Sequence, residues 1–235
     1  MLAVTAIDVY IQASHILRRV SLEVAAREVV CLVGRNGAGK TTTLRAVMGY
    51  LRPRTGHIAF RGQEIQGRRT HEIARLGLGF APEDGGIFSD LTVAENIEIS
   101  TWTRPAGRPA AERLELAYRV FPALRRHMAR KGPEMSGGER KMLSIARALA
   151  LDADMLLLDE PFEGLSPAII PAVSEGIASI TGLGHSILIA ESNIYHVPEF
   201  AARLYVIERG EIIFAGRPGD VHADRAVMRV IGGAA

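Results

Sequence analysis

The sequence has few of the features that mark secreted or membrane-spanning proteins. Its 235 residues include one cysteine, Cys31, which lies in an apolar run, so a disulfide framework is not supported. The N-terminus has no basic patch followed by an apolar core, and no apolar run reaches the roughly 18 to 20 residues that cross a bilayer. We therefore expect a cytosolic chain that cannot span a membrane by itself.

An excess of charge of either sign is also missing. The chain has 28 basic and 26 acidic residues, and a formal charge of +2 gives no indication of a nucleic-acid partner. Only three of the basic residues are lysines, namely Lys40, Lys131 and Lys141. Hydrophobic residues make up 48% of the chain, a share that favours one compact domain or two joined lobes.

Alternating strand and helix patterns predict an α/β fold with a mostly parallel sheet. Residues 92–151 are helical in pattern and begin with a capping box formed by Thr92 and Glu95. The tail contains a hairpin near Gly210 and then a helical pattern over residues 220–230. The predicted strands are 3–9, 20–24, 29–33, 57–60, 155–158, 186–190 and 203–207.

A complete phosphate-loop pattern, G-x-x-x-x-G-K-[ST], lies between a predicted buried strand and a helix. Its small residues allow backbone N–H groups to wrap a phosphate chain at the positive end of the helix. We expect Lys40 to reach the β and γ phosphates and Thr41 to bind Mg²⁺. An ordinary glycine-rich turn is the alternative. The predicted ATP contacts here are Gly34, Asn36, Gly37, Ala38, Gly39, Lys40, Thr41 and Thr42.

Two acidic residues, Asp159 and Glu160, directly follow an apolar run of four residues. Ligands of open α/β sheets bind at the carboxyl ends of the strands, so both carboxylates are expected at the phosphate site. We expect Asp159 to hold Mg²⁺ and Glu160 to act as the catalytic residue that orients or deprotonates an attacking water. The alternative is a polar cap on a strand end.

A second potential phosphate-binding helix start is formed by Ser136, Gly137 and Gly138. The serine hydroxyl and the unobstructed N–H groups of the glycines suit a γ-phosphate at the positive end of the helix that follows. A serine N-cap followed by a glycine turn explains the same residues without a ligand.

These motifs together resemble the ATP-binding subunits of ABC transporters, and the resemblance covers essentially the whole chain. It implies one domain over residues 1–235 with the P-loop NTPase fold of ABC type. Residues 1–90 and 152–235 would form an α/β core with an antiparallel β lobe, and residues 91–151 a helical subdomain that bears the signature. The resemblance also implies that Tyr10 stacks on adenine.

The same resemblance implies the partners. In that family two ATP-binding subunits pair head to tail, as a heterodimer or homodimer, and the Ser136–Gly138 segment of one closes over ATP held by the other. Transmembrane permease subunits and, indirectly, an external solute-binding protein complete the assembly. The chain would lie on the cytoplasmic face of the inner membrane.

Within this family the chain most resembles the smaller ATPase of branched-chain amino acid importers. Pro82 and Glu83 stand where most members have a glutamine loop, and residues 163–167 resemble a Gly-Leu-x-Pro turn. Residues 14–17 instead resemble the urea importers. The implied function is import of a small polar solute, with amino acids as the first expectation and urea as the alternative.

One departure concerns the γ-phosphate. Most members place a histidine where this chain has Ser192, a shorter and neutral group, and His196 one turn later is a weak substitute. Ser192 and Glu83 are nonetheless retained as expected nucleotide contacts. A chain that binds ATP statically as half of a heterodimer therefore remains an alternative, as do a soluble ABC ATPase and a phosphate-loop kinase.

Overall fold

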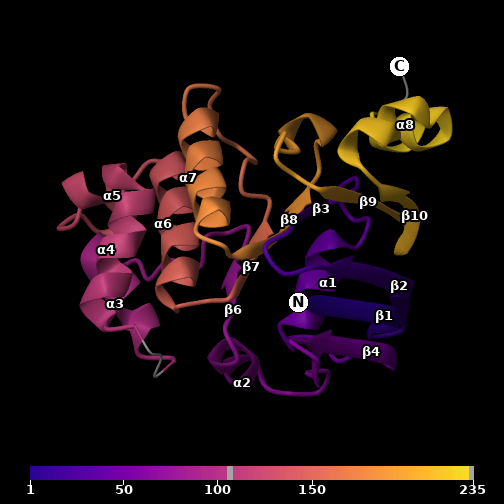
Figure 1. Cartoon of the computed structure of the whole chain (residues 1–235), viewed down its shortest axis with the longest axis horizontal. Coiled ribbons are helices and arrows are strands. Elements are labelled where there is room, and N and C mark those ends of the chain that lie inside the picture. The colour runs from indigo at the N-terminus through magenta and orange to yellow at the C-terminus, as the bar shows by residue number, and fades with distance from the viewer. Residues whose placement is uncertain (105–107, 233–235) are drawn as a thin grey trace.

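The computed structural model describes residues 1–104 and 108–232, in which two β sheets lie beside a group of helices (Figure 1). Helices α3 (Val93–Thr101) to α6 (Gly137–Ala150) gather at one end of the molecule, on the left of Figure 1. Strands β1 (Leu2–Ile11), β2 (Ser14–Val24) and β4 (Thr55–Phe60) lie at the opposite end. The mostly parallel sheet runs between them and carries the phosphate loop.

The larger sheet has six strands in the order β10-β9-β3-β8-β7-β6. Its pairs are parallel except for the hairpin β9–β10, which is antiparallel. The neighbours β3, β8 and β7 are far apart in sequence, yet their carboxyl ends meet at one edge of the sheet. The strands are β3 (Val29–Val33), β6 (Leu78–Ala81), β7 (Met155–Asp159), β8 (Ser186–Glu191), β9 (Arg203–Glu208) and β10 (Glu211–Gly216).

The apolar runs predicted as strands are covered on both faces. In β3, Val29, Cys31 and Val33 belong to the core on one side of the sheet. Val30 and Leu32 belong to the core on the other side. A strand packed on both sides needs apolar side chains at every position, which is why these runs show no alternation with polar residues.

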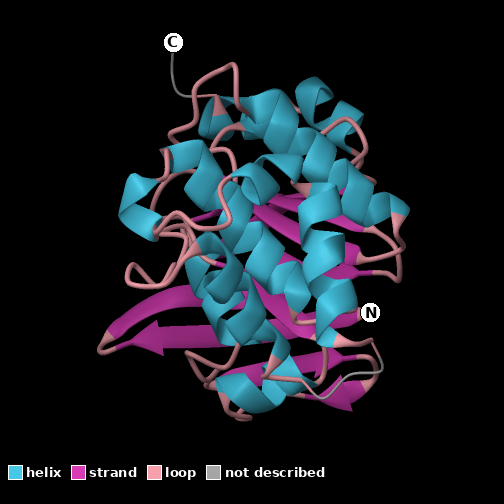
Figure 2. Ribbon diagram, turned by 90° about the vertical axis from the view of Figure 1, so that its left-hand side faces the viewer, coloured by secondary structure: helices cyan, strands magenta, loops and turns pink. Residues whose placement is uncertain are grey.

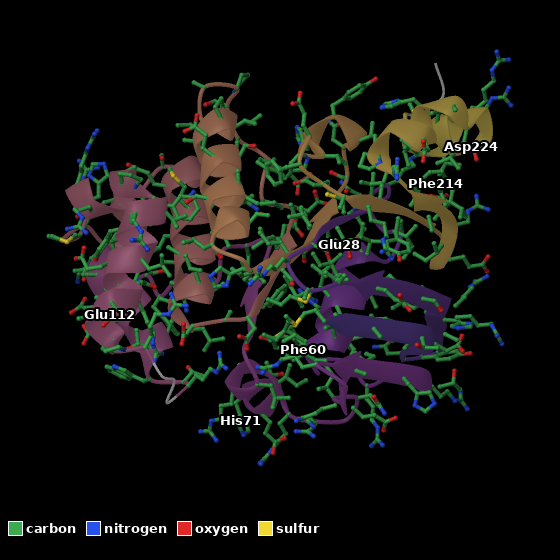
Figure 3. All side chains as sticks on the ribbon, in the orientation of Figure 1. Glu28, Phe60, His71, Glu112, Phe214 and Asp224 are labelled. Carbon is green, nitrogen blue, oxygen red and sulfur yellow. The ribbon has the colours of Figure 1, made fainter. Side chains whose placement is uncertain are left out.

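The smaller sheet is antiparallel, with the order β2-β1-β4-β5. Its inner face packs on helix α1, and the side chain of Phe60 is fully buried there, whereas Glu112 lies at the outer edge of the helices (Figure 3). The strands are β1 (Leu2–Ile11), β2 (Ser14–Val24), β4 (Thr55–Phe60) and β5 (Gln63–Glu64). The predicted strands at residues 3–9, 20–24 and 57–60 are therefore parts of longer ones.

Helices lie in front of the strands when the molecule is viewed from the helical end (Figure 2). The predicted capping box is present, because Thr92 Oγ1 accepts the N–H of Glu95 at 3.2 Å and Glu95 Oε2 accepts the N–H of Thr92 at 2.7 Å. None of the described helices has the length and apolar character needed to cross a membrane. The remaining helices are α1 (Lys40–Val47), α2 (Thr70–Arg75), α4 (Ala110–Val120), α5 (Pro122–Arg126), α7 (Ile170–Gly182), η1 (Gly132–Glu134) and η2 (Ile194–His196).

The C-terminal helical pattern over residues 220–230 corresponds to two short helices instead of one. They are η3 (Pro218–Ala223) and α8 (Arg225–Ile231). The break falls at Asp224, whose carboxylate accepts the N–H groups of Ala226 and Val227 and so begins a new helix. The sequence pattern alone did not reveal this internal cap.

Candidate functional site

The phosphate loop leads from the end of β3 directly into α1 and requires glycine at both ends. A Cβ atom on Gly34 would lie 2.3 Å from the carbonyl oxygen of Ile207. Gly39 has φ of +117°, and its Cβ would lie 2.7 Å from Leu17 Cδ2. The loop leaves the first N–H groups of α1 without intrahelical partners, which is the arrangement that binds phosphate.

Lys40 is buried and its ammonium is turned inward. Its Nζ donates to the carbonyl oxygens of Gly34 at 2.7 Å and Arg35 at 3.2 Å. The same Nζ lies 3.0 Å from Glu160 Oε1, with both side chains about 5% exposed or less. The charge of Lys40 is therefore balanced by the neighbouring glutamate.

Thr41 and Asp159 meet at the mouth of the loop. The Thr41 hydroxyl donates to Asp159 Oδ1 at 3.2 Å. Burial raises the pKa of Asp159 to about 6, assisted by the charges of Glu160 and Glu83, while the hydrogen bond from Thr41 acts in the opposite direction. An added positive charge at this position would favour the ionised form of Asp159.

Glu160 adopts a left-handed backbone conformation, with φ of +50°. Its N–H donates to the carbonyl oxygen of Ala190 at 2.9 Å. Its Oε2 accepts the N–H of Ser192 at 3.0 Å and the Ser192 hydroxyl at 3.1 Å. Such a conformation costs about 1 to 3 kcal/mol and persists only where the surroundings hold it.

A cavity of about 320 Å³ lies beside the phosphate loop and brings half of the expected site residues together. Three carboxylates line this cavity, those of Glu83, Glu160 and Glu163. Burial and the charges of Glu160 and Glu83 raise the pKa of Glu163. The lining residues are Asn36, Gly37, Gly39, Lys40, Thr41, Thr42, Glu83, Glu160 and Glu163.

Ser136 forms the N-cap of α6, as the simpler interpretation required. Its hydroxyl accepts the N–H of Glu139 at 3.3 Å, and Glu139 Oε2 accepts the N–H of Ser136 at 2.7 Å. Among the described residues that line the cavity beside the phosphate loop, Ser136, Gly137 and Gly138 are absent. One copy of the chain therefore does not bring the two helix starts together.

Tyr10 lies in the β1–β2 hairpin, where its ring has partners of its own. It stacks on the ring of His15 with centroids 4.2 Å apart, and the guanidinium of Arg54 lies 5.2 Å from its centroid. The next residue, Ile11, is 43% exposed and shares a strand face with Val9, which pairs with Leu17 beside the phosphate loop. A stacked adenine would have to displace the partners of Tyr10.

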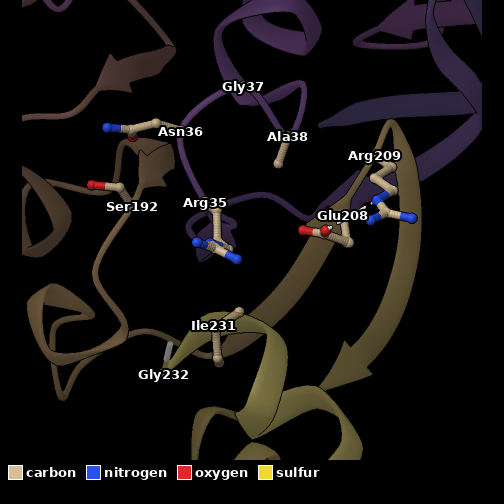
Figure 4. Close-up of a pocket in the computed structure, with 9 residues that line it drawn as sticks. All are labelled: Arg35, Asn36, Gly37, Ala38, Ser192, Glu208, Arg209, Ile231 and Gly232. Carbon is tan, nitrogen blue, oxygen red and sulfur yellow. Dashed lines mark ion pairs between the residues drawn. The ribbon is translucent and has the colours of Figure 1, made fainter. Parts of the chain in front are cut away.

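A second cavity, of about 540 Å³, shares Asn36 and Gly37 with the first (Figure 4). Ser192 and Asn36 border it on one side and the ion-paired Glu208 and Arg209 on the other, with Ile231 near the chain's end below. Ser192 thus donates hydrogen bonds to Glu160 and also lines this second cavity. Ala38 lines this second cavity and not the first.

The expected histidine substitute, His196, contacts a different acid. Its Nδ1 lies 3.3 Å from Glu191 Oε2, and its ring packs edge-on against Phe162. His185 precedes β8, and its Nδ1 lies 2.7 Å from the carbonyl oxygen of Ala153. Phe162 is buried in the core, which accounts for an aromatic residue after the acidic pair.

Lys141 and Glu191 lie beside the site and, like Glu163, were not among the expected site residues. Lys141 Nζ donates to the carbonyl oxygens of Glu83 and Glu160, both at 2.7 Å. Glu191 is fully buried, and burial together with the charge of Glu160 raises its pKa. Lysine is scarce in this chain, and that scarcity distinguishes Lys141 as much as Lys40.

Comparison with known proteins agrees with this geometry. The chain matches the ABC transporter family over residues 17–163, more than half of its length. It is 36% identical over 217 residues to the lipopolysaccharide export system ATP-binding protein LptB of Acidithiobacillus ferridurans, covering 92% of this chain and 89% of the relative. It is 34% identical over 213 residues to the high-affinity branched-chain amino acid transport ATP-binding protein BraG of Pseudomonas aeruginosa, covering 91% of both.

Solved structures show the same fold. The ADP conformation of an ATP-binding cassette of an ABC transporter has a TM-score of 0.85 and 26% identity, and the match covers 99% of this chain and 98% of that one. A nucleotide-free cassette of an ABC transporter gives the same score and identity, covering 98% of each chain. The resemblance to the ATP-binding subunits is thereby confirmed, and relatives from branched-chain amino acid transport are among the matches. The chain belongs to the ABC transporter family, as an ATP-binding subunit whose ATPase activity is coupled to transport.

Proposed function

We propose that two copies of this ATPase, or this chain and a related one, enclose two ATP molecules and drive a permease that imports a small polar solute. The observation that carries the proposal is the placement of Glu160 beside a complete phosphate loop, with Lys40 and Thr41 in the same cavity. Static ATP binding needs no carboxylate at that position, whereas hydrolysis needs one near the attacking water.

The chemistry begins with an exchange of partners at Lys40. A polyphosphate in the loop attracts the ammonium away from Glu160, because the phosphate chain carries more charge than one carboxylate. Glu160 is then free to accept a proton from the water whose oxygen attacks the γ-phosphorus, while the bond to the ADP oxygen breaks. Ser192 keeps the carboxylate aimed through its two donors on Oε2.

Mg²⁺ fits the pair of oxygen donors at the mouth of the loop. The Thr41 hydroxyl and the Asp159 carboxylate are hard ligands that already lie 3.2 Å apart. We propose that both hold the ion, Asp159 through water. When bound, the ion neutralises negative charge on the phosphates.

The second helix start supports the dimer. Gly137 is exposed, and a Cβ there would meet no atom within 4 Å, so this position leaves room for a ligand from outside. The N-terminus of α6, a helix of 14 residues, would face the γ-phosphate held by the other copy. Residues 91–151, which carry this segment, are proposed to act as one helical subdomain.

A groove of about 350 Å³ supports the permease contact. It lies between the end of α1, strand β6, the loop after β6 and helix α6, and Phe80 and Pro82 line it. Tyr50 is 58% exposed at its rim, and the ring centroids of Tyr50 and Phe80 are 6.2 Å apart. A groove with an exposed tyrosine ring beside a half-buried phenylalanine suits a helix from a membrane subunit. The chain would therefore lie on the cytoplasmic face of the membrane.

The solute is proposed from the relatives. BraG of Pseudomonas aeruginosa and LivF of Archaeoglobus fulgidus, at 34% and 33% identity, are named for branched-chain amino acid transport. We therefore place an amino acid first. Urea comes second, on the resemblance of residues 14–17 to the urea importers. The LptB relatives, named for lipopolysaccharide export, support export as the competing direction.

The test is Mg-ATP hydrolysis by the purified chain across a series of protein concentrations, with Glu160→Gln as the control. Specific activity that rises with concentration and is lost in the variant supports paired hydrolytic sites. Firm ATP binding without hydrolysis, either alone or with a co-purifying partner subunit, contradicts the hydrolytic role and favours a static one.

A further inference from the structure

Lys141 lies where three parts of the molecule meet. It belongs to the second turn of α6, the helix that begins at the Ser136 cap. Its ammonium donates at 2.7 Å to the carbonyl oxygen of Glu83, in the loop after β6, and at 2.7 Å to the carbonyl oxygen of Glu160, after β7. One side chain thus joins a helix and two loops that are separated by 58 and 19 residues from it.

The bond to Glu160 completes a set of contacts that holds this residue. Its N–H is bonded to Ala190, its Oε1 to Lys40 and its Oε2 to Ser192. Lys141 is the partner of the carbonyl oxygen that comes from the helical end of the molecule. Because φ of Glu160 is +50°, loss of one of these contacts allows the backbone to relax toward a commoner conformation.

Burial of Lys141 opposes its charge, and the nearby carboxylates offset only part of that effect. Burial lowers its pKa, but the charges of Glu163, Glu83, Glu191 and Glu160 all act to raise it. Two hydrogen bonds to carbonyl oxygens, both at 2.7 Å, hold the ammonium in place. Donation to both carbonyl oxygens requires N–H groups, and attraction to the nearby carboxylates requires a positive charge. Only a cationic side chain with N–H donors supplies both.

We propose that Lys141 is a positioning residue, which holds the turn at Glu160 and the loop at Glu83 against the helix that begins at Ser136. Through this link, the aim of the carboxylate in one ATP site depends on the placement of the helix that serves the other site. The inference rests on the proposed hydrolysis for its catalytic consequence, but the structural link exists in the free chain.

The test compares Lys141→Met, Lys141→Arg and the matched control Lys131→Met. Methionine keeps the length and packing of lysine but loses its charge and donors, whereas arginine keeps both. Lys131 is an exposed lysine of the helical end, so its substitution changes net charge equally. For each variant we would measure kcat, KM for Mg-ATP, melting temperature, and amide exchange in the nucleotide-free chain.

We expect Lys141→Met to lower kcat by about tenfold or more, with KM changed less than about threefold, because misplacement of a catalytic group affects the chemical step. Amide exchange should quicken at Gly85 and Glu163, whose N–H groups bond within the two loops. Lys141→Arg should restore both readings, and Lys131→Met should change neither.

Two results would overturn the inference. One is a Lys141→Met variant with normal kcat and a raised KM, since that pattern indicates charge screening alone. The other is faster exchange spread over α3, α4 and α6 with a lowered melting temperature, which indicates general support of the fold. If the unaltered chain hydrolyses no ATP, the proposed function fails, but local exchange at the two loops still decides whether Lys141 holds them.

Discussion

Lys40 and Glu160 form an ion pair at 3.0 Å in which both side chains are almost fully buried. The lysine begins helix α1 and the glutamate follows strand β7, so the pair closes the cavity that a polyphosphate would enter. Nucleotide binding must separate the two groups before the carboxylate can act on water. The ion pair with Lys40 thus engages one of the two oxygens of the proposed catalytic carboxylate.

Removal of one member of this ion pair should lower the free energy of unfolding more than removal of both. Lys40→Met leaves Glu160 buried without its partner, and we expect a loss of roughly 3 kcal/mol in the free energy of unfolding without nucleotide. The double variant Lys40→Met, Glu160→Gln removes both charges and should recover most of the loss. Chemical denaturation of the three proteins measures both values, and equal stability of the single and double variants would contradict the prediction.

Ser192 predicts an effect on the rate of hydrolysis with little effect on binding. Ser192→Ala removes the hydroxyl donor to Glu160 Oε2 but keeps the backbone donor. We expect kcat to fall by about tenfold while KM stays within about twofold, because one charge-assisted bond of two is lost. Ser179→Ala, on the exposed face of α7, is the control. An unchanged kcat in Ser192→Ala would show that the hydroxyl does not aim the carboxylate.

Glu191 predicts a dependence of stability on pH. Burial raises its pKa above the ordinary value of 4.5, so the folded chain binds this proton more tightly than the unfolded chain. The stability it contributes is therefore fully present below about pH 4.5 and is lost as the pH rises toward the raised value. We expect the melting temperature of Glu191→Gln to exceed that of the unaltered chain, by a difference that grows between pH 6 and about 9. Parallel melting curves across that range would contradict this assignment.

Glu83 predicts a salt-dependent change in ATP affinity. Its carboxylate adds negative charge to a cavity that receives phosphates. We expect Glu83→Gln to tighten ATP binding by about threefold at low ionic strength and to have no effect near 1 M salt, where the screening length is about 3 Å. The control Glu112→Gln changes net charge equally on the exposed side of α4. Weaker binding in Glu83→Gln would instead indicate that the carboxylate helps to hold a metal ion.

Tyr10 predicts a small effect on nucleotide affinity. Its ring is stacked on His15 and lies under Arg54, so a base would have to replace one of them. We expect Tyr10→Ala to change the Kd for ATP by less than about threefold, and Ile11→Ala to weaken binding more, since Ile11 shares the strand face that leads to the phosphate loop. A loss of tenfold or more in Tyr10→Ala would restore the adenine contact expected from the sequence.

The sequence by itself determined the local parts of this protein. Gly34, Gly39 and Lys40 specify the phosphate loop, because backbone conformation and the start of a helix depend on neighbouring residues. The apolar runs that became β3 and β7 were equally evident, since a strand covered on both faces needs apolar residues throughout. The capping boxes at Thr92 and Ser136 are local for the same reason.

Only the tertiary structure decided how these parts meet. The order β3-β8-β7 places the ends of three strands side by side, and that order brings Lys40 to Glu160 and Ser192 to the same carboxylate. The roles of Lys141 and Glu191 depend on contacts between segments tens of residues apart, and no short-range pattern encodes them. The physical reason is that the burial and charge around a side chain depend on every element packed against it. A sequence motif describes only the one element that contains it.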